Sequence, residues 1–158
     1  MLPLPGFQPM AGLVPALVID VLLGPEQDLG RVAAGRRTDY PIAGGTFVAV
    51  DPEGGHQAGR VLPGGADHFL LRDDGIGVLD AAYRLEADDG TVIRIHNRGL
   101  WIPNAAGEEP RADELYCRCA PVFEAPAGAF AWLSAHVFAG RVDYPAPGRV
   151  LVSCCRLL

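Results

Sequence analysis

The chain contains no lysine, so all 13 of its basic residues are arginines. It carries 19 acidic residues, which gives a formal net charge of −6 at pH 7, and the arginines are scattered along the chain instead of forming one stripe. A protein with this charge repels a polyanion such as DNA. We therefore expect no nucleic-acid partner.

Long apolar runs are also missing. No stretch approaches the roughly 20 apolar residues that a membrane-spanning helix needs, so we expect no membrane partner. With 158 residues, 49% of them apolar and 20% charged, the composition is typical of one globular domain covering residues 1–158, with an irregular segment at 1–12. The first ten residues, MLPLPGFQPM, lack a basic residue and contain several prolines, unlike a secretory signal, so we expect a cytoplasmic protein.

The chain lacks the usual motifs of metal and nucleotide sites. Its four cysteines, at positions 117, 119, 154 and 155, match neither the spacing of a zinc ribbon nor that of a redox CxxC pair. The four histidines, at 56, 68, 96 and 136, show no metal-ligand spacing either. No GxGxxG fingerprint, P-loop or nucleophile elbow occurs. We therefore expect no metal and no cofactor.

Helical periodicity is almost absent, and what replaces it is typical of β-structure. Short apolar or alternating stretches are broken by Gly, Pro or Asp about every ten residues. The pattern predicts an all-β domain, a single antiparallel β-barrel of about 8 to 10 strands, with a short helical turn near 127–132. A sandwich is the alternative, but the tight spacing and the removal of exposed strand edges favour a barrel. Such a barrel is either filled by side chains or holds one small ligand.

The stretch from 77 to 99 is predicted to be a hairpin that turns at Asp88, Asp89 and Gly90. A two-residue loop would mix apolar and charged side chains on one face, whereas a three-residue loop with Gly90 in the left-handed conformation separates them. The inner pairs then become Leu85 with Ile93, Tyr83 with Ile95, and Ala81 with Asn97, and Asp80 lies opposite Arg98 on the outer face.

Two residues stand out within this hairpin. Asn97 is the polar member of an otherwise apolar face, and a buried amide must find hydrogen-bond partners or a ligand that supplies them. Tyr83 is expected to line either the core or a cavity, as is Trp132 further along the chain.

The segment VLPGGADHF, residues 61–69, interrupts a strand with a proline and two glycines and then places Asp67 before an apolar run. Gly64 and Gly65 can adopt backbone angles closed to other residues, so they can redirect the chain and place Asp67 at a barrel rim. Two interpretations remain: Asp67 caps the turn through backbone amides, or it belongs to a site.

Arg118 and Glu124 lie in the alternating stretch 114–123 and directly after it. Arg118 is either an outward side chain, an internal ion-pair partner of a carboxylate, or an anchor for a carboxylate or enolate. Glu124, beside Phe123, is either a salt-bridged structural residue or a general acid or base with a raised pKa. The acidic stretch 102–113 before them is either a loop over one end of the barrel or an ordinary connection.

Five stretches taken together resemble the Domain of Unknown Function 3237 family: PIAGGTF (41–47), GRVLPGGAD (59–67), LDAAY (79–83), NRG (97–99) and YCRCAPVFEAPAGAFAWL (116–133). The resemblance runs from about residue 13 to the end and implies a calycin-like β-barrel of bacterial or fungal type without an assigned activity. It draws attention to the segments 44–45, 63–67 and 79–83 and to Asn97, Arg118, Phe123, Glu124 and Trp132. His68 stands where the family tends to show an aromatic residue, and Ala82 where it tends to show an arginine.

Three functional hypotheses follow. The first is a barrel that binds a small organic molecule, with a site formed by Asp67, Tyr83, Asn97, Arg118, Glu124 and Trp132. The second is a cofactor-independent lyase, isomerase or cyclase in which Asp67 or Glu124 moves a proton and Arg118 stabilises an oxyanion, and it requires these groups to converge on one pocket. The third is a structural or protein-interaction barrel, and homo-oligomer formation is compatible with all three.

Overall fold

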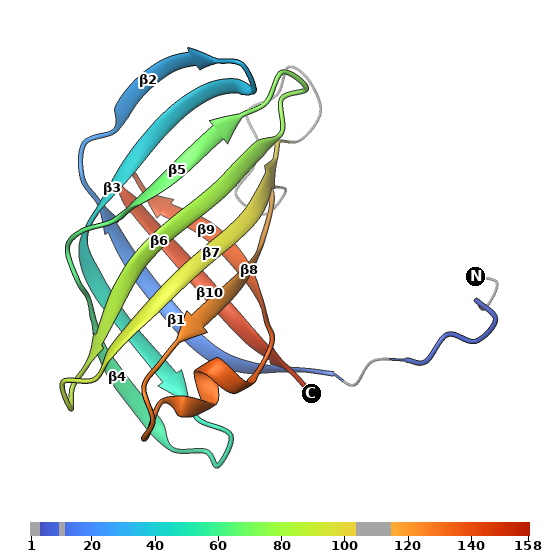
Figure 1. Cartoon of the computed structure of the whole chain (residues 1–158), viewed down its shortest axis with the longest axis vertical. Coiled ribbons are helices and arrows are strands. Elements are labelled where there is room, and N and C mark those ends of the chain that lie inside the picture. The colour runs from blue at the N-terminus through green and yellow to red at the C-terminus, as the bar shows by residue number, and fades with distance from the viewer. Residues whose placement is uncertain (1–3, 10–11, 104–114) are drawn as a thin grey trace.

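The computed structural model describes residues 4–9, 12–103 and 115–158. The described chain is almost entirely β-structure with one short 3-10 helix (Figure 1). The strands are β1 (Leu13–Leu23), β2 (Gln27–Val32), β3 (Gly35–Val50), β4 (His56–Val61), β5 (Ala66–Leu71), β6 (Gly77–Ala87), β7 (Val92–Ile102), β8 (Tyr116–Glu124), β9 (Phe138–Ala146) and β10 (Arg149–Leu157), and the helix η1 spans Ala131–Ala135.

The strands close into an antiparallel barrel. The sheet runs β1-β10-β9-β8-β7-β6, continues through β4 and β5 to β3, and β3 pairs back onto β1. β4 and β5 both lie between β3 and β6 and together occupy one strand position of the barrel. β2 pairs with β3 outside the ring. The closed barrel therefore has eight strand positions. The predicted antiparallel β-barrel is confirmed.

The β6–β7 hairpin has the predicted register. Leu85 pairs with Ile93, Ala81 pairs with Asn97, and Gly90 has a φ of +87°. The Ala87 and Thr91 backbones bond across the loop, with a distance of 2.8 Å from the Ala87 nitrogen to the Thr91 oxygen. The predicted three-residue loop is therefore confirmed, because one face of a half-buried hairpin must be apolar.

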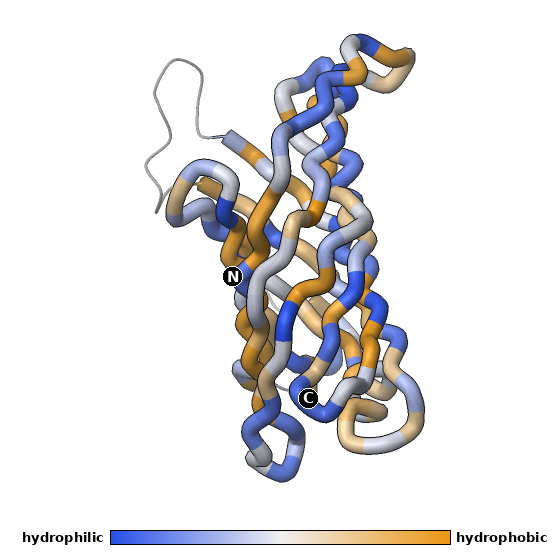
Figure 2. Tube along the Cα trace, turned by 90° about the vertical axis from the view of Figure 1, so that its left-hand side faces the viewer, coloured by the Kyte–Doolittle hydropathy of each residue, from blue (hydrophilic) through white to orange (hydrophobic). Residues whose placement is uncertain are grey.

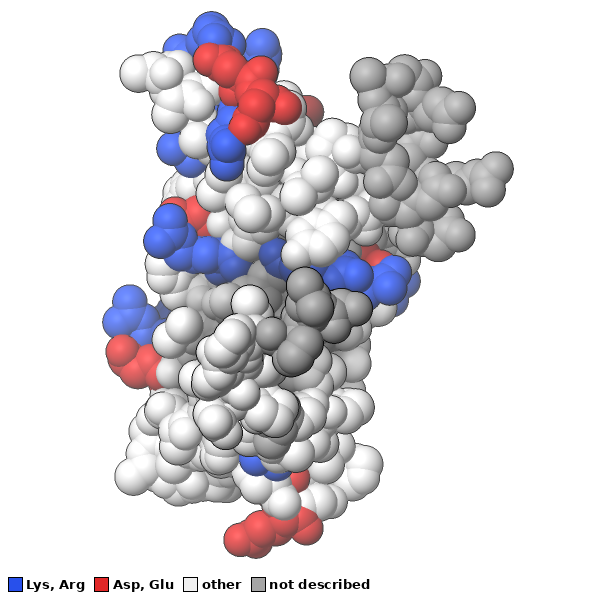
Figure 3. Space-filling view, turned by 90° about the vertical axis from the view of Figure 1, so that its right-hand side faces the viewer, with Lys and Arg blue, Asp and Glu red and all other residues white. Residues whose placement is uncertain are grey.

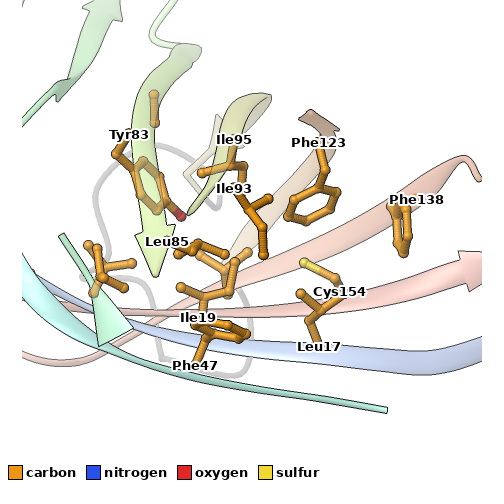
Figure 4. Close-up of a cluster of buried hydrophobic side chains, with 14 of the residues drawn as sticks. Leu17, Ile19, Phe47, Tyr83, Leu85, Ile93, Ile95, Phe123, Phe138 and Cys154 are labelled. Carbon is orange, nitrogen blue, oxygen red and sulfur yellow. The ribbon is translucent and has the colours of Figure 1, made fainter. Parts of the chain in front are cut away.

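Side chains alternate between the barrel interior and the solvent along β6, β7 and β8. Hydrophobic and hydrophilic residues likewise follow one another along the strands in Figure 2. The interior of one half of the barrel is filled with large apolar side chains (Figure 4). Ile19, Leu85 and Ile93 are completely buried there. η1 lies at 131–135 instead of the predicted 127–132, and it covers the end of this half with Leu133 and with Phe130, the residue directly before it.

The Pro-Gly-Gly segment connects β4 to β5, which share one strand position of the barrel. The six-residue step from Val61 to Asp67 lies opposite the four-residue step from Leu85 to Ala81 on β6, so two residues bulge out of the pairing. A Cβ on Gly65, whose φ is +77°, would lie 2.1 Å from the Ala82 carbonyl oxygen. Only glycine permits this close approach. Because the bulge contains two residues, the Asp67 side chain points into the barrel, as that of Val61 does.

Two remaining predictions concern the chain outside the barrel wall. Most of the acidic stretch 102–113 lies outside the described residues, between the ends of β7 and β8. Among the residues that the structure covers, no helix has the length and apolarity needed to cross a membrane.

Candidate functional site

The half of the barrel opposite η1 is hollow. It contains a cavity of about 590 Å³, which is in the size range of sites for small organic molecules. The cavity is lined by Val21, Leu23, Tyr40, Ile42, Asp67, Phe69, Leu79, Ala81, Tyr83, Asn97, Trp101, Val142, Tyr144, Pro145, Ala146, Pro147, Gly148, Arg149, Val150 and Val152. Three of the six predicted site residues, Asp67, Tyr83 and Asn97, therefore lie on it.

One cross-strand row carries three of the polar side chains of the cavity. Tyr40 on β3 pairs with Asp67 on β5, Asp67 pairs with Ala81 on β6, and Ala81 pairs with Asn97 on β7. Directly opposite residues of an antiparallel sheet project from the same face. Asp67 and Asn97 therefore flank the small Ala81 side chain, which leaves space between them.

The Asp67 carboxyl group is held in an environment that disfavours its charge. Loss of solvation raises its pKa to about 6, and the negative charges of Asp80 and Asp39 act in the same direction. The Asp80 backbone N–H, which donates to Asp67 Oδ1 at 2.9 Å, and the nearby His68 partly offset this rise. Asp67 thus changes its protonation state close to neutral pH.

Tyr83 and Asn97 each present a buried polar atom without a partner. Among the described residues, nothing hydrogen-bonds to the Tyr83 hydroxyl or to Asn97 Oδ1, although the two residues are only 6% and 4% exposed. The Tyr83 side chain points into the barrel interior above the apolar core (Figure 4). Burial raises the pKa of this hydroxyl, which therefore stays protonated and can donate a hydrogen bond.

Aromatic side chains form the wall next to Asp67. Tyr40, Phe69 and Trp101 pack edge to face in a chain, with ring centroids 6.1 Å apart for the first pair and 6.3 Å for the second. On the other side of the cavity, the Tyr144 hydroxyl lies 3.7 Å from the Cys117 Sγ atom. The cavity is thus largely apolar and aromatic, with a few polar groups.

The β9–β10 hairpin forms part of the rim. Arg149 binds Asp20 on β1 through two hydrogen bonds of 2.9 and 2.6 Å, and the Leu23 backbone nitrogen donates to the Gly148 oxygen at 2.9 Å. The side-chain hydrogen bond to Arg149 keeps the pKa of Asp20 below its usual value. These contacts tie the rim to β1.

Arg118 does not reach the cavity. Its neighbours in β8, Cys117 and Cys119, point inward, so strand alternation places Arg118 outside. Its guanidinium lies 5.1 Å from the Tyr116 ring centroid and donates to the Cys117 carbonyl oxygen at 3.0 Å. Basic side chains gather in a band on the outer surface of this side of the barrel (Figure 3), and Arg118 pairs with Arg141 across the β8–β9 ladder.

Glu124 and Trp132 are also outside the cavity. Glu124 follows the inward-facing Phe123, and its exposed carboxylate lies 3.8 Å from Arg94. Trp132 belongs to η1 at the opposite end, where it packs on Phe138 and donates to Gln57 Oε1 at 3.1 Å. The expected convergence of Asp67, Glu124 and Arg118 is therefore not formed, because alternation along β8 turns the latter two to the solvent.

Sequence analysis missed Tyr40, Phe69, Trp101 and Tyr144. The alternation of side chains along a strand could have identified two of them. Phe69 lies two residues after Asp67, and Trp101 lies four residues after Asn97, so each shares its neighbour's inward face. Tyr40 reaches the site through the β3–β5 pairing, and Tyr144 reaches it because the closed barrel places β9 across from β5.

Histidine and carboxylate pairs occur on the outer wall. His68 Nδ1 lies 2.8 Å from Asp39 Oδ1, and His96 Nε2 lies 2.6 Å from Asp80 Oδ1. Within the described ranges, no group of three or more metal-ligating side chains converges.

Similar proteins are known in several bacteria. A UPF0311 protein of Rhodopseudomonas palustris is 31% identical over 129 residues, which cover 77% of this chain and 81% of that protein. A UPF0311 protein of Clostridium acetobutylicum is 34% identical over 111 residues, 66% of this chain and 67% of that protein.

Solved structures share the fold. A conserved protein of unknown function from R. palustris superposes with a TM-score of 0.83 at 29% identity, covering 96% of this chain and 100% of that one. A β-barrel-like protein from Acinetobacter baumannii gives 0.80 at 27% identity, covering 98% and 100%. A protein described as an enzyme from Penicillium herquei gives 0.70 at 16% identity, covering 98% and 100%, which shows a common fold alone.

The family model described as protein of unknown function (DUF3237) matches residues 11–157. This range includes every strand of the barrel and all the residues that line the cavity. The chain belongs to the DUF3237 family.

Proposed function

We propose that this protein binds a small organic molecule in the open half of its barrel. The observation that carries the proposal is the pair of unpartnered polar atoms, the Tyr83 hydroxyl and Asn97 Oδ1, on the wall of a cavity of about 590 Å³. A purely structural barrel would gain stability from filling this space with side chains, as the half near η1 does.

The energetics support a ligand with polar groups at defined positions. Leaving a buried donor or acceptor without a partner costs about 1–3 kcal/mol. Water inside the cavity reduces this cost, and a ligand that displaces the water must replace its hydrogen bonds. The apolar remainder of the wall provides the hydrophobic driving force, and Tyr83 and Asn97 orient the ligand.

Binding is tested with N-phenyl-1-naphthylamine, an uncharged dye whose fluorescence rises in apolar surroundings. We expect saturable fluorescence with the native protein and a loss of most of the signal in Ala81→Leu, which places a larger side chain between Asp67 and Asn97. The control is Ala82→Leu, because Ala82 is the next residue of β6 and faces the solvent. Thermal unfolding of both variants shows that they are folded.

Native mass spectrometry of the purified protein, followed by denaturing extraction, looks for a small molecule that co-purifies. A bound metabolite that is lost from Ala81→Leu and kept by Ala82→Leu supports the proposal. It is overturned if the native protein neither retains a molecule nor binds the dye, or if Ala81→Leu binds the dye as the control does.

A second function, proton transfer without a cofactor, is favoured by the position of Asp67. A carboxyl group with a pKa of about 6 on an apolar cavity wall is suited to accept and return a proton at neutral pH. Asp67 would take a proton from a carbon next to a substrate carbonyl, the electron pair would move to the carbonyl oxygen, and the Tyr83 hydroxyl would donate a hydrogen bond to that oxygen. Return of the proton to a different carbon gives an isomer and restores Asp67.

Turnover of candidate unsaturated carbonyl compounds tests this second function by following hydrogen exchange with deuterated water. We expect exchange to be lost in Asp67→Asn and kept in Glu124→Gln and Arg118→Gln, whose side chains lie outside the barrel. Exchange that persists in Asp67→Asn rules out Asp67 as the base.

A further inference from the structure

We propose that the cavity is built for a ligand that carries a protonated amine, with the ammonium group seated between Asp67 and the aromatic wall. This inference rests on the binding function proposed above and names the chemical class of the ligand.

The first support is a carboxylate without a cationic partner. Among the described residues, Asp67 forms no ion pair, and its one assigned hydrogen bond comes from the Asp80 backbone. The nearest charged groups on the adjacent strands, Asp80 on β6, Asp39 on β3 and His68 on its own strand, lie on the outer wall and act on Asp67 only through their charge. His68 is bound to Asp39 at 2.8 Å and His96 to Asp80 at 2.6 Å, so neither histidine is an ion-pair partner of Asp67. A bound cation would favour the charged form of this desolvated carboxylate.

The basic side chain of the described cavity lining already has an acidic partner. Within the described lining, Arg149 is the single basic side chain, and it is bound to the Asp20 carboxylate by two hydrogen bonds. An anionic ligand would therefore face Asp67 without a free cation to pair with. The overall charge of −6 also attracts cations and repels anions during approach.

The aromatic wall suits an ammonium group. Tyr40 lies directly opposite Asp67 across the β3–β5 ladder, and Phe69 lies two residues further along β5 on the same face. With Trp101 they form an edge-to-face chain beside a carboxylate. Aromatic faces attract ammonium cations, most strongly in a desolvated site.

The unpartnered polar atoms are consistent with a ligand rich in donors. A primary ammonium group has three N–H donors and no acceptor. The cavity offers acceptors in the Asp67 carboxylate and Asn97 Oδ1, and the oxygen of the Tyr83 hydroxyl can also accept. A ligand with an amine at Asp67 and a further N–H or O–H donor near Asn97 would satisfy these atoms.

The test compares three compounds of nearly equal size and different charge: 2-phenylethylamine, 2-phenylethanol and phenylacetate. Each is used to displace N-phenyl-1-naphthylamine from the native protein at pH 7.5 and low salt. We expect the amine to displace the dye at a concentration about tenfold lower than the alcohol, and phenylacetate to be the weakest. In Asp67→Asn the amine should lose this advantage, whereas Asp67→Glu should keep part of it.

A pH series on the native protein gives a second measurement that needs no variant. Between pH 7.5 and 5 the ammonium group stays charged while Asp67 becomes protonated, so the advantage of the amine over the alcohol should shrink. The inference is overturned if the amine displaces the dye no better than the alcohol, or if its advantage survives in Asp67→Asn; the binding function then still stands. If the native protein does not bind the dye or retain any molecule, the binding function fails, and this inference fails with it.

Discussion

Asp67 and Asn97 project into the barrel from strands β5 and β7, on either side of Ala81, in one cross-strand row. The short Ala81 side chain between them helps keep that part of the interior open. The opposite half of the barrel is filled by residues such as Leu85 on β6 and Ile93 on β7. The barrel is therefore divided along its axis into a packed half and a hollow half.

Replacing Asp67 with Asn should stabilise the protein at alkaline pH. The folded-state pKa of about 6 lies above the reference value of 3.8, so the folded protein binds more protons than the unfolded chain between these values. The contribution of the Asp67 carboxyl group to stability is greatest below the pKa of the unfolded chain and is lost as the pH rises through about 6. At about 1.4 kcal/mol per pKa unit, the Asn variant should gain about 1–3 kcal/mol over the native protein at pH 8.

Urea unfolding of the native protein and Asp67→Asn at pH 8, 6 and 4 measures this difference. The gain should shrink steadily toward pH 4, because both proteins are then uncharged at this position. A constant difference across the series would show that Asp67 is not destabilised by its charge.

Leu85→Ala should destabilise the barrel much more than a change of similar size in the hollow half. Leu85 is completely buried in the packed half, so truncation should cost about 2–5 kcal/mol. Ala81→Leu adds the same atoms beside existing free space and should change the free energy of unfolding by less than about 1.5 kcal/mol. Chemical unfolding of the two variants checks the contrast, and an equal loss in both would mean that the cavity is not open in solution.

Gly65→Ala should strongly impair folding because both the backbone conformation and the available space require glycine. The new Cβ would lie 2.1 Å from the Ala82 carbonyl oxygen at a φ of +77°, so β5 would have to move away from β6. We expect a loss of more than about 3 kcal/mol, beyond the 1–3 kcal/mol that an unfavourable backbone conformation costs by itself.

Gly64→Ala is the matched control for that experiment. Gly64 also has a positive φ, of +112°, but its Cβ would meet no atom within 4 Å. Its substitution should therefore cost the backbone contribution alone, on the order of 1–3 kcal/mol. Equal thermal unfolding temperatures for the two variants would contradict a role for the contact with Ala82.

Asn97→Leu should keep or slightly raise stability while changing ligand selection. The substitution removes an amide oxygen that has no partner among the described residues, together with the hydrogen bond of the amide group to Cys119, and introduces an apolar group of similar size. We expect the free energy of unfolding to rise by up to about 1 kcal/mol. Co-purified or displaced compounds with hydroxyl or N–H groups should bind more weakly, measured by the same dye assay. A clear loss of stability would show that the bond to Cys119 outweighs the cost of the unpartnered oxygen.

Several features of the site follow from local sequence alone. The register of the β6–β7 hairpin follows from separating apolar from charged side chains and from the left-handed requirement at Gly90, and it places Asn97 correctly on the inner face. Strand alternation also indicates that Arg118 and Glu124 lie on the opposite face of β8 from Phe123. It does not indicate which of these two faces is inside the barrel. That assignment needed the packed neighbours Cys117 and Phe123.

The sequence by itself determined the β-structure, the strand spacing, the tight hairpin and the break before Asp67, because these depend on side-chain alternation and on glycine's backbone freedom. The tertiary structure decided that β3 closes on β1, that β4 and β5 share one strand position of the barrel, and that Tyr40 and Tyr144 line the same cavity as Asp67. These contacts join residues far apart in the chain, and no local pattern specifies them. The charge environment of Asp67 likewise arises only when the closed barrel removes its water.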